Sequence, residues 1–508
     1  MSRRDALWLV ALVAAAIVVR LPGLGTGLWR DEGSTYFDAT APTLAATLRE
    51  IRLAEINPPG YFLLMRAWLA IAGTSDVTMK LPSLLCGVAL VPATYALGRC
   101  IASNAAALLA AAFAACATTA IDLSTDARPY ALAALLAALA TAAAFRALAP
   151  NDDAPHLATL AGYVVAAVAL AYVQYTGLLL ACGLAFGATI ATLAFRPRLR
   201  LLPFLGANAI VAAAYLPWLP ALAPGNHVAA SWLQPIGAGQ LPGRILEQLG
   251  YALPVDFMRA QYALALLVAF LVALALRRVR PEVAAGAVAL LAALVVETLL
   301  LLREPRYVFV FTPLANVSIA LALVALVRAG ARSNPARALA ALVAVTLLAG
   351  VPAQTRAYAR RLGDPERSGM RAIVSTYRAY LGPGTLIVVA PDYLGPSLGY
   401  YLRAIPGATL TGVPHGDHPE RFRCCEDAWR APLLVADSER AIARRARGFA
   451  RIAFVYDPDV TDRGDVPYSR VRELRDRLRL RYRLVAEGAS RRDLEPVAIA
   501  IFLVPKQR

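Results

Sequence analysis

The sequence predicts an α-helical polytopic membrane protein with a small α/β domain at its C-terminal end. The 508 residues are 59% hydrophobic and only 17% charged, whereas soluble domains carry about 25% charged residues. Apolar stretches long enough to cross a bilayer recur from the N-terminus to about Pro352. They consist mostly of Ala, Leu and Val without strand-like alternation, which favours helices over a barrel.

The apolar stretches predict eleven membrane spans, the first of which is a retained helix because no small-residue cleavage site follows it. The apolar segment 58–72 is too short to cross comfortably, and we expect an interfacial helix there that lies along the membrane. The expected spans are 6–24, 78–98, 104–122, 128–147, 157–175, 177–195, 199–221, 260–276, 281–302, 307–327 and 337–353.

The basic residues predict the orientation of these spans. Arg and Lys cluster in alternate short loops, which is the pattern of cytoplasmic loops. The N-terminus is therefore expected in the cytoplasm and, after an odd number of spans, the C-terminal region is expected outside. This orientation would bring the loops with unusual polar motifs to one outer face: 25–77, 122–128, 174–175, 222–259 and 303–307.

The composition changes after residue 354, where long apolar runs end and Arg, Asp, Pro and Tyr become frequent. We therefore predict a membrane domain over 1–354 and an outer α/β domain over 355–508. No phosphate loop, dinucleotide fingerprint or catalytic triad motif occurs in the second. Its expected strands are 385–390, 452–456 and 497–504, and its expected helices are 367–380, 396–402, 437–447 and 468–478.

The net charge of +17 does not predict a nucleic-acid partner, because much of the excess is Arg at the ends of spans. The six Cys have no metal-ligand spacing. His415 and His418 could bind a metal, but an ordinary polar loop is the simpler interpretation. We predict no metal site, and the sequence leaves the need for a divalent cation open.

The acidic pair Asp31-Glu32 follows the first span directly. Two carboxylates at a membrane boundary have an unfavourable free energy unless they contact water, a cation or a substrate. A carboxylate in such a partly desolvated place has a raised proton affinity and can act as a general base. The simpler alternative is that the pair only marks the end of a span.

Two further segments place arginines at the boundaries of spans. Arg128 lies between Asp126 and Tyr130, and a guanidinium there could clamp a phosphate or could be an interfacial anchor beside an aromatic residue. Arg306 lies between Glu304 and Tyr307 on the side where Arg is disfavoured. An anionic ligand would explain it, as would an ion pair with Glu304 or a contact with lipid headgroups.

Tyr175, with Tyr172 and Gln174, is the remaining candidate for a binding residue. The three side chains could line a sugar-sized pocket. An aromatic belt at the membrane surface is the commoner explanation for such residues.

Together these segments resemble the membrane glycosyltransferases of the C-type fold, in the branch of the aminoarabinose and galacturonic acid transferases and the protein O-mannosyltransferases. The resemblance covers about 1–350 and rests on the order and spacing of short motifs. These are Leu28-Trp29-Arg30-Asp31-Glu32, Asn57-Pro58-Pro59-Gly60-Tyr61, Lys80-Leu81-Pro82-Ser83, Asp126-Ala127-Arg128-Pro129-Tyr130, Leu216-Pro217-Trp218 and Pro305-Arg306-Tyr307.

The resemblance implies a polyprenyl-phosphate sugar as donor and a lipid, glycan or protein as acceptor, at the outer face of a bacterial inner membrane. It implies that Asp31 is the base toward the acceptor, that Glu32 supports it, and that Arg128 and Arg306 hold the donor phosphate during an inverting displacement. Gly33-Ser34-Thr35 follows the acidic pair, where aminoarabinose transferases typically have Ala-Arg-Tyr. The sugar and the acceptor therefore stay open.

Two other classes of function compete with an enzyme. A transporter or flippase of a lipid-linked glycan should bury charges near the middle of broken helices. This chain keeps nearly all its charges at the ends of spans, with Glu297 as an exception. A non-catalytic assembly protein, whose outer domain binds a partner, is the third alternative, and nothing in the C-terminal sequence excludes it.

Overall fold

The structure is a computed structural model in which the chain forms two compact units. We call Met1–Leu24, Lys80–Pro220 and Leu233–Asp364 the helical unit, and Gly25–Met79, Ala221–Trp232 and Pro365–Arg508 the α/β unit. The predicted boundary after residue 354 remains a prediction. The structure describes residues 2–148, 157–195, 201–222, 238–240, 242–243, 286, 289–290, 305–331, 334–422, 433–461 and 468–505.

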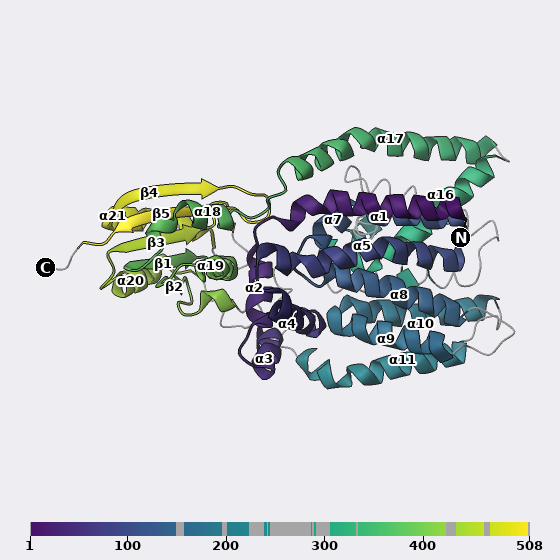
Figure 1. Ribbon diagram of the computed structural model, residues 1–508, viewed down its shortest axis with the longest axis horizontal. Helices are drawn as coiled ribbons and strands as arrows, with labels where there is room; N and C mark the ends of the chain where they lie inside the picture. The colour runs from purple at the N-terminus through teal and green to yellow at the C-terminus, as the bar shows by residue number, and fades with distance from the viewer. Residues whose placement is uncertain are drawn as a thin grey trace. The chain divides into compact units, whose positions relative to one another are not determined.

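Long apolar helices make up most of the helical unit, and Figure 1 shows many of them running roughly parallel. The helices of this unit in the described ranges are α1 (Arg3–Leu24), α5 (Asp76–Ile101), α6 (Asn104–Cys116), α7 (Thr118–Ser124), α8 (Tyr130–Leu148), α9 (Leu157–Val173), α10 (Thr176–Phe195), α11 (Leu201–Tyr215), α15 (Pro305–Val308), α16 (Thr312–Gly330) and α17 (Asn334–Gly363). The described ranges also contain the 3-10 segments η1 (Leu216–Leu222), η3 (Ala238–Gln240) and η4 (Phe309–Phe311).

Six helices in the described ranges are long and apolar enough to cross a membrane, or seven if one bent pair counts as a single span. The expected span 104–122 is this pair, in which α6 and α7 meet at 57°. Between them Ala117 adopts an extended backbone with φ −61° and ψ 129°, which ends α6. The spans expected at 260–276 and 281–302 lie almost entirely outside the described residues.

Small side chains let the helices of this unit approach closely. The buried face of α8 carries Ala133 and Ala137 one turn apart, and Ala140 and Ala144 repeat the spacing. A Cβ atom added at Gly98 of α5 would lie 2.9 Å from the backbone of Ala107 in α6. Without a hydrophobic driving force inside the membrane, such close contact is a main source of helix association.

The α/β unit contains a five-stranded sheet in the order β2-β1-β3-β5-β4. The strands are β1 (Thr385–Ala390), β2 (Thr409–Gly412), β3 (Arg451–Tyr456), β4 (Arg483–Ser490) and β5 (Val497–Leu503). β1 pairs in parallel with β2 and β3, while β5 is antiparallel to both β3 and β4. Figure 1 shows this order, from β4 at the top to β2 at the bottom.

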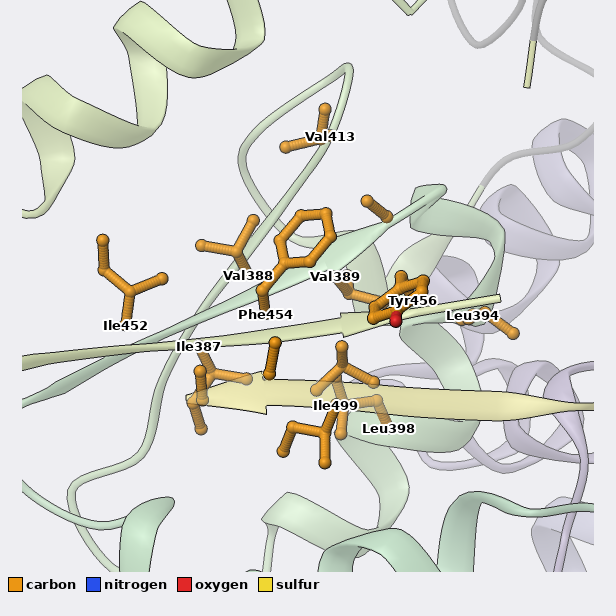
Figure 2. Packing of buried hydrophobic residues seen from close by; sticks show 14 of the residues in the cluster. Ile387, Val388, Val389, Leu394, Leu398, Val413, Ile452, Phe454, Tyr456 and Ile499 are labelled. Atoms are coloured by element: carbon orange, nitrogen blue, oxygen red, sulfur yellow. The ribbon is translucent and has the colours of Figure 1, made fainter. Parts of the chain in front are cut away.

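Continuous apolar strands build the core of this unit. Every residue of β1 is buried, and Ile387 and Val388 pack in one cluster with Phe454 of β3 and Ile499 of β5 (Figure 2). The helices of the C-terminal part that pack with the sheet and its connections are α18 (Met370–Thr376), α19 (Gly395–Leu402), α20 (Val435–Arg445) and α21 (Val471–Arg481).

The strands and helices predicted for this region are confirmed, whereas β2 and β4 were not predicted. β2 has only four residues. β4 is an edge strand whose side chains alternate between exposed and half-buried, and its sequence Arg-Leu-Val-Ala-Glu-Gly-Ala-Ser has little of the β-branched character that marks a strand.

The segment that follows the first span belongs to the α/β unit and forms three short helices. They are α2 (Arg30–Ala39), α3 (Leu44–Ala54) and α4 (Gly60–Ala72). The helix predicted over 58–72 is therefore present as α4, and its position along a membrane remains a prediction. Arg66 of α4 joins the three helices, since it donates to the carbonyls of Ala39 (3.2 Å) and Ala41 (2.6 Å) and to the hydroxyl of Thr47 (3.0 Å).

Candidate active site

The two acidic residues of the first loop lie in the first turn of α2 but have different surroundings. The Asp31 side chain is 24% exposed and lies 3.4 Å from the guanidinium of Arg30. Glu32 is buried, and its Oε2 accepts the backbone N–H of Trp29 at 3.1 Å. A Glu that reaches back to the N-cap amide in this way satisfies a donor that the helix itself leaves open. Glu32 therefore stabilises the start of α2, and Asp31 is the more accessible carboxylate.

Side chains of the C-terminal region hold the backbone on either side of Trp29. The amide of Gly27 donates to Glu366 Oε1 (2.8 Å), and that of Leu28 donates to the Tyr401 hydroxyl (2.6 Å). The amide of Arg30 donates to Glu495 Oε1 at 2.9 Å. Three donors that precede or begin the helix thus find acceptors more than three hundred positions away in the sequence.

Close backbone contact fixes α2 against α19. A Cβ atom added at Gly33 would lie 2.5 Å from the carbonyl carbon of Pro396. That distance is too short for any larger residue without movement of the backbone. Farther along α2, Tyr36 packs edge-on against Tyr400 with ring centroids 5.1 Å apart.

An ion-pair network fixes the two ends of the 25–79 segment. Arg371 donates to the carbonyl of Gly25 at 2.7 Å and pairs with Glu366 (2.5 Å) and Asp76 (3.3 Å). Tyr401 donates to the same Asp76 carboxylate at 3.2 Å. The network joins both ends of the 25–79 segment to α18 and α19. Residues of the C-terminal region therefore hold the segment that contains α2 in place.

Glu495 is a buried acidic residue that contacts the start of α2. Complete burial raises the pKa of its carboxyl to about 7, although the Ser368 hydroxyl, the Arg30 charge and the Ser397 hydroxyl each favour the ionised form. Asp31 and Glu32 were predicted from sequence, but Glu366, Tyr401 and Glu495 were not. No local pattern marks these three residues, because their roles depend on a pairing of distant segments.

In the helical unit, Asp126, Arg128 and Tyr130 lie in and beside the short connection between α7 and α8. All three are buried. The connection is tight, since the amide of Arg128 donates to the carbonyl of Asp126 at 2.7 Å. Ser83 of α5 donates to the Arg128 carbonyl at 3.2 Å. Arg128 is therefore held by its backbone among apolar helices, a setting in which a guanidinium interacts strongly with an anion.

A second group of predicted residues gathers around the start of α15. The side-chain amide of Gln174 donates to the carbonyls of Arg306 (3.4 Å) and Tyr307 (3.5 Å). The Arg306 guanidinium lies 5.2 Å from the centre of the Tyr307 ring. Next to Gln174 in sequence, the Tyr175 hydroxyl accepts from the Trp218 indole at 3.2 Å.

Packing between α15 and α7 places these two groups on neighbouring elements of one unit. The structure therefore brings the Arg306 segment near the helix that leads to Asp126 and Arg128. Glu304 lies outside the described residues. Asp31 and Glu32 belong to the α/β unit, whereas Arg128 and Arg306 belong to the helical unit.

Asp122, at the end of the same helix α7, has a partner that the sequence did not reveal. Arg361 of α17 donates to both of its carboxylate oxygens, at 2.9 and 2.8 Å. Bidentate geometry makes this a strong pair. It ties α17 to the turn that precedes Asp126.

Within the described ranges, no group of three or more His, Cys, Asp or Glu side chains could hold a metal ion. His415 contacts Asp392 instead, with its Nδ1 2.5 Å and its amide 3.1 Å from Oδ2. His418 lies on the surface beside Glu420. The two histidines thus have separate local partners.

Comparison with known proteins supports the predicted resemblance. Residues 57–220, less than half of the chain, match the sequence profile of the dolichyl-phosphate-mannose-protein mannosyltransferase family. No curated protein sequence matches the chain.

Solved structures match nearly the whole chain. ArnT from Cupriavidus metallidurans in the apo state matches with a TM-score of 0.59 at 15% identity, over 97% of each chain. The same protein bound to undecaprenyl phosphate gives a TM-score of 0.56 at 15% identity, over 97% of this chain and 98% of that one.

The archaeal oligosaccharyltransferase AglB from Archaeoglobus fulgidus, in complex with an inhibitory peptide and a dolichol-phosphate, gives a TM-score of 0.53 at 13% identity. That match covers 89% of this chain and 69% of AglB. These likenesses show the fold: a helical membrane protein with a small C-terminal sheet domain, in the arrangement of ArnT. The predicted fold class and the predicted resemblance are confirmed, whereas the number of eleven spans stays a prediction.

Proposed function

We propose that this protein is a glycosyltransferase that moves a sugar from a polyprenyl-phosphate donor to a lipid, glycan or protein acceptor. The observation that carries the proposal is the ArnT fold, which covers 97% of both chains and includes a structure bound to undecaprenyl phosphate. The mannosyltransferase profile over 57–220 supports the same class. We place the reaction at the outer face of a bacterial inner membrane, with the N-terminus cytoplasmic and the α/β domain periplasmic.

In the proposed reaction Asp31 is the general base. The acceptor's nucleophilic atom attacks the anomeric carbon of the sugar while the bond from that carbon to the phosphate oxygen breaks. The polyprenyl phosphate leaves with the bonding electrons, Asp31 takes the acceptor's proton, and the anomeric configuration inverts. The partial exposure of Asp31 supports this assignment, because a base must reach the substrate. Glu32 is assigned a supporting role, since its carboxylate caps α2.

Arg128 and Arg306 are the proposed partners of the donor phosphate. Charge accumulates on the phosphate as it leaves, and guanidinium groups fixed beforehand stabilise that charge without reorganisation. Arg128 is buried and Arg306 is half-buried, which supports the assignment because charge interactions are stronger away from water. The remaining predicted binding residues are proposed to line the site: Asp126, Tyr130, Tyr175, Glu304 and Tyr307.

A transporter or flippase is not favoured. Arg20 is a buried charge in the span α1, and its guanidinium donates to the carbonyls of Ala114 (3.0 Å), Ala115 (2.9 Å) and Ala16 (3.1 Å). Backbone acceptors therefore account for this buried charge without a transported ion. Glu297, the other intramembrane charge singled out from the sequence, lies outside the described residues.

The test is an assay of the purified protein with undecaprenyl-phosphate donors that carry mannose, galacturonic acid or 4-amino-4-deoxyarabinose. Membrane extracts of cells that lack the protein supply the acceptor. Mass spectrometry should detect a new product that carries one of the sugars, together with release of undecaprenyl phosphate. Transport of a lipid-linked glycan into vesicles, without cleavage of any donor, would contradict the proposal.

A further inference from the structure

Glu495 lies where three segments of the α/β unit meet, in the connection between β4 and β5. A backbone bridge pairs it in parallel with Ser368. Its carbonyl accepts the amide of Gly369 at 2.8 Å, and its own amide donates to the carbonyl of Arg367 at 3.1 Å. The backbone of Glu495 is thus fixed by the segment that leads into α18.

The carboxylate of Glu495 accepts hydrogen bonds from two further segments. Its Oε1 accepts the Arg30 amide of α2 at 2.9 Å and the Ser397 hydroxyl of α19 at 3.1 Å. Its Oε2 accepts the Ser368 hydroxyl at 2.6 Å. The carboxylate therefore ties the first residue of α2 to α19 and to the segment that leads into α18 at a single point.

The Arg30 amide is one of the donors that a helix leaves unsatisfied at its N-terminus. Trp29 occupies the N-cap position and has no side-chain capping bond. A carboxylate is the strongest natural acceptor at this end of a helix, because its charge complements the helix dipole. Here a residue 465 positions farther along the chain supplies it. The charged group that acts on Glu495 is the guanidinium of Arg30, which also lies 4.9 Å from the centre of the Tyr393 ring.

We infer that Glu495 is a positioning residue, which caps α2 from the C-terminal domain and thereby fixes the direction in which Asp31 presents its carboxylate. Asp31 is the next residue after Arg30, so a change in the direction of the Arg30 amide rotates the first turn that carries Asp31. The catalytic consequence rests on the proposed function. The contact between Glu495 and α2 does not depend on the proposed function. It gives the C-terminal domain a structural role, which is to position Asp31.

Hydrogen exchange tests the structural link in the full-length protein, without any substrate. Glu495→Ala should raise exchange of the amides over 28–34 by about ten-fold, as expected for the loss of a hydrogen bond to a charged group. Exchange in β3 and in the helical unit should not change. Unchanged protection of 28–34 in Glu495→Ala would overturn the inference.

Two replacements of similar size separate a hydrogen-bonding role from simple packing. In Glu495→Gln the side-chain carbonyl can still accept from Arg30, and its amide can donate to the Ser368 hydroxyl, so protection should return to within about three-fold of wild type. Glu495→Met fills the same space without an acceptor and should resemble Glu495→Ala. Equal protection in the Gln and Met variants would overturn the inference. Glu487→Gln, on the exposed edge strand β4, is the matched control and should behave as wild type.

Kinetics test the catalytic consequence with the undecaprenyl-phosphate sugar that proves active. Glu495→Met should lower kcat about ten-fold or more and change the KM for the donor less than three-fold, whereas Glu495→Gln should keep most of kcat. An equal kcat for the Met and Gln variants would contradict the catalytic consequence. If no donor is cleaved at all, the proposed function fails, while the exchange experiment still decides the structural link.

Discussion

The acidic helix α2 and the basic segments of the helical unit are held in place by different means. Acceptors from the C-terminal region fix the backbone of 27–30. Contacts within the helical unit fix Arg128 and Arg306, such as the tight Asp126–Arg128 turn and the Gln174 amide. The proposed base therefore depends on polar, titratable groups outside the spans, whereas the proposed phosphate ligands depend on the packing of membrane helices.

This difference gives the two regions different sensitivities. Changes of pH, or substitutions in the C-terminal domain, should act on α2 and on turnover. Substitutions among the spans should act on binding of the carrier lipid.

Loss of the proposed phosphate contact should have the largest effect on binding. Arg306→Ala should weaken binding of undecaprenyl phosphate about 100-fold, since a charge-assisted contact with a phosphate is lost. Arg306→Lys should be intermediate, because lysine keeps the charge without the bidentate fork. Binding to protein in detergent is measured by titration. Arg328→Ala, an exposed arginine at the end of α16, is the control. Unchanged affinity in Arg306→Ala would remove this residue from the phosphate site.

Glu495 should make stability depend on pH. Its pKa rises from 4.5 in the unfolded chain to about 7 in the folded protein, so the folded state binds the proton more tightly. The stabilisation from the protonated group is fully present below pH 4.5 and is lost as the pH rises through about 7. Relative to Glu495→Gln, the wild type should lose about 3 kcal/mol over this interval.

Melting curves of both full-length proteins at pH 4.5, 6 and 8 measure this dependence. The difference in melting temperature, wild type minus Glu495→Gln, should fall steadily as the pH rises. A difference that stays constant across the series would mean that Glu495 does not titrate in this interval.

A Cβ atom added at Gly33, where α2 contacts α19, should lower the stability of the protein. Gly33→Ala should destabilise the protein by about 1–3 kcal/mol, the usual penalty for overpacking, although alanine favours a helix. A Cβ atom at Gly25, by contrast, meets nothing within 4 Å. Gly25→Ala is therefore the matched control, and equal melting temperatures for the two variants would contradict the close packing of α2.

The smallest effect should come from the local cap. Glu32→Ala should cost about 1 kcal/mol through loss of the acceptor for the Trp29 amide, while Glu32→Gln should keep most of that bond. We expect both variants to retain measurable transfer. Complete loss of activity in Glu32→Gln, with normal melting, would instead make Glu32 a catalytic partner of Asp31.

The sequence predicted those parts of the fold that local pattern determines. The continuous apolar runs of β1, β3 and β5 mark buried strands, and the long Ala-Leu-Val stretches mark spans. The edge strand β4 and the bend at Ala117 could not be predicted, since neither carries a strong local signal; the bend lies in an Ala-rich run without Pro or Gly.

For the candidate site, the acidic pair was visible because it ends the first apolar run. The capping role of Glu32 follows from its position three residues after Trp29. The acceptors Glu366, Tyr401 and Glu495 were not visible, because a hydrogen bond across 339 to 465 positions leaves no trace in local composition. The Asp122–Arg361 pair was missed for the same reason.

The central claim is that Asp31 is the base, and turnover of Asp31→Asn with the active undecaprenyl-phosphate sugar tests it most directly. Asparagine has nearly the same shape but cannot take the proton. We therefore expect turnover to fall about 1,000-fold or more, with unchanged melting temperature and unchanged affinity for undecaprenyl phosphate. Asp437→Asn, on the exposed surface of α20, should keep full turnover. Wild-type turnover in Asp31→Asn would contradict the account.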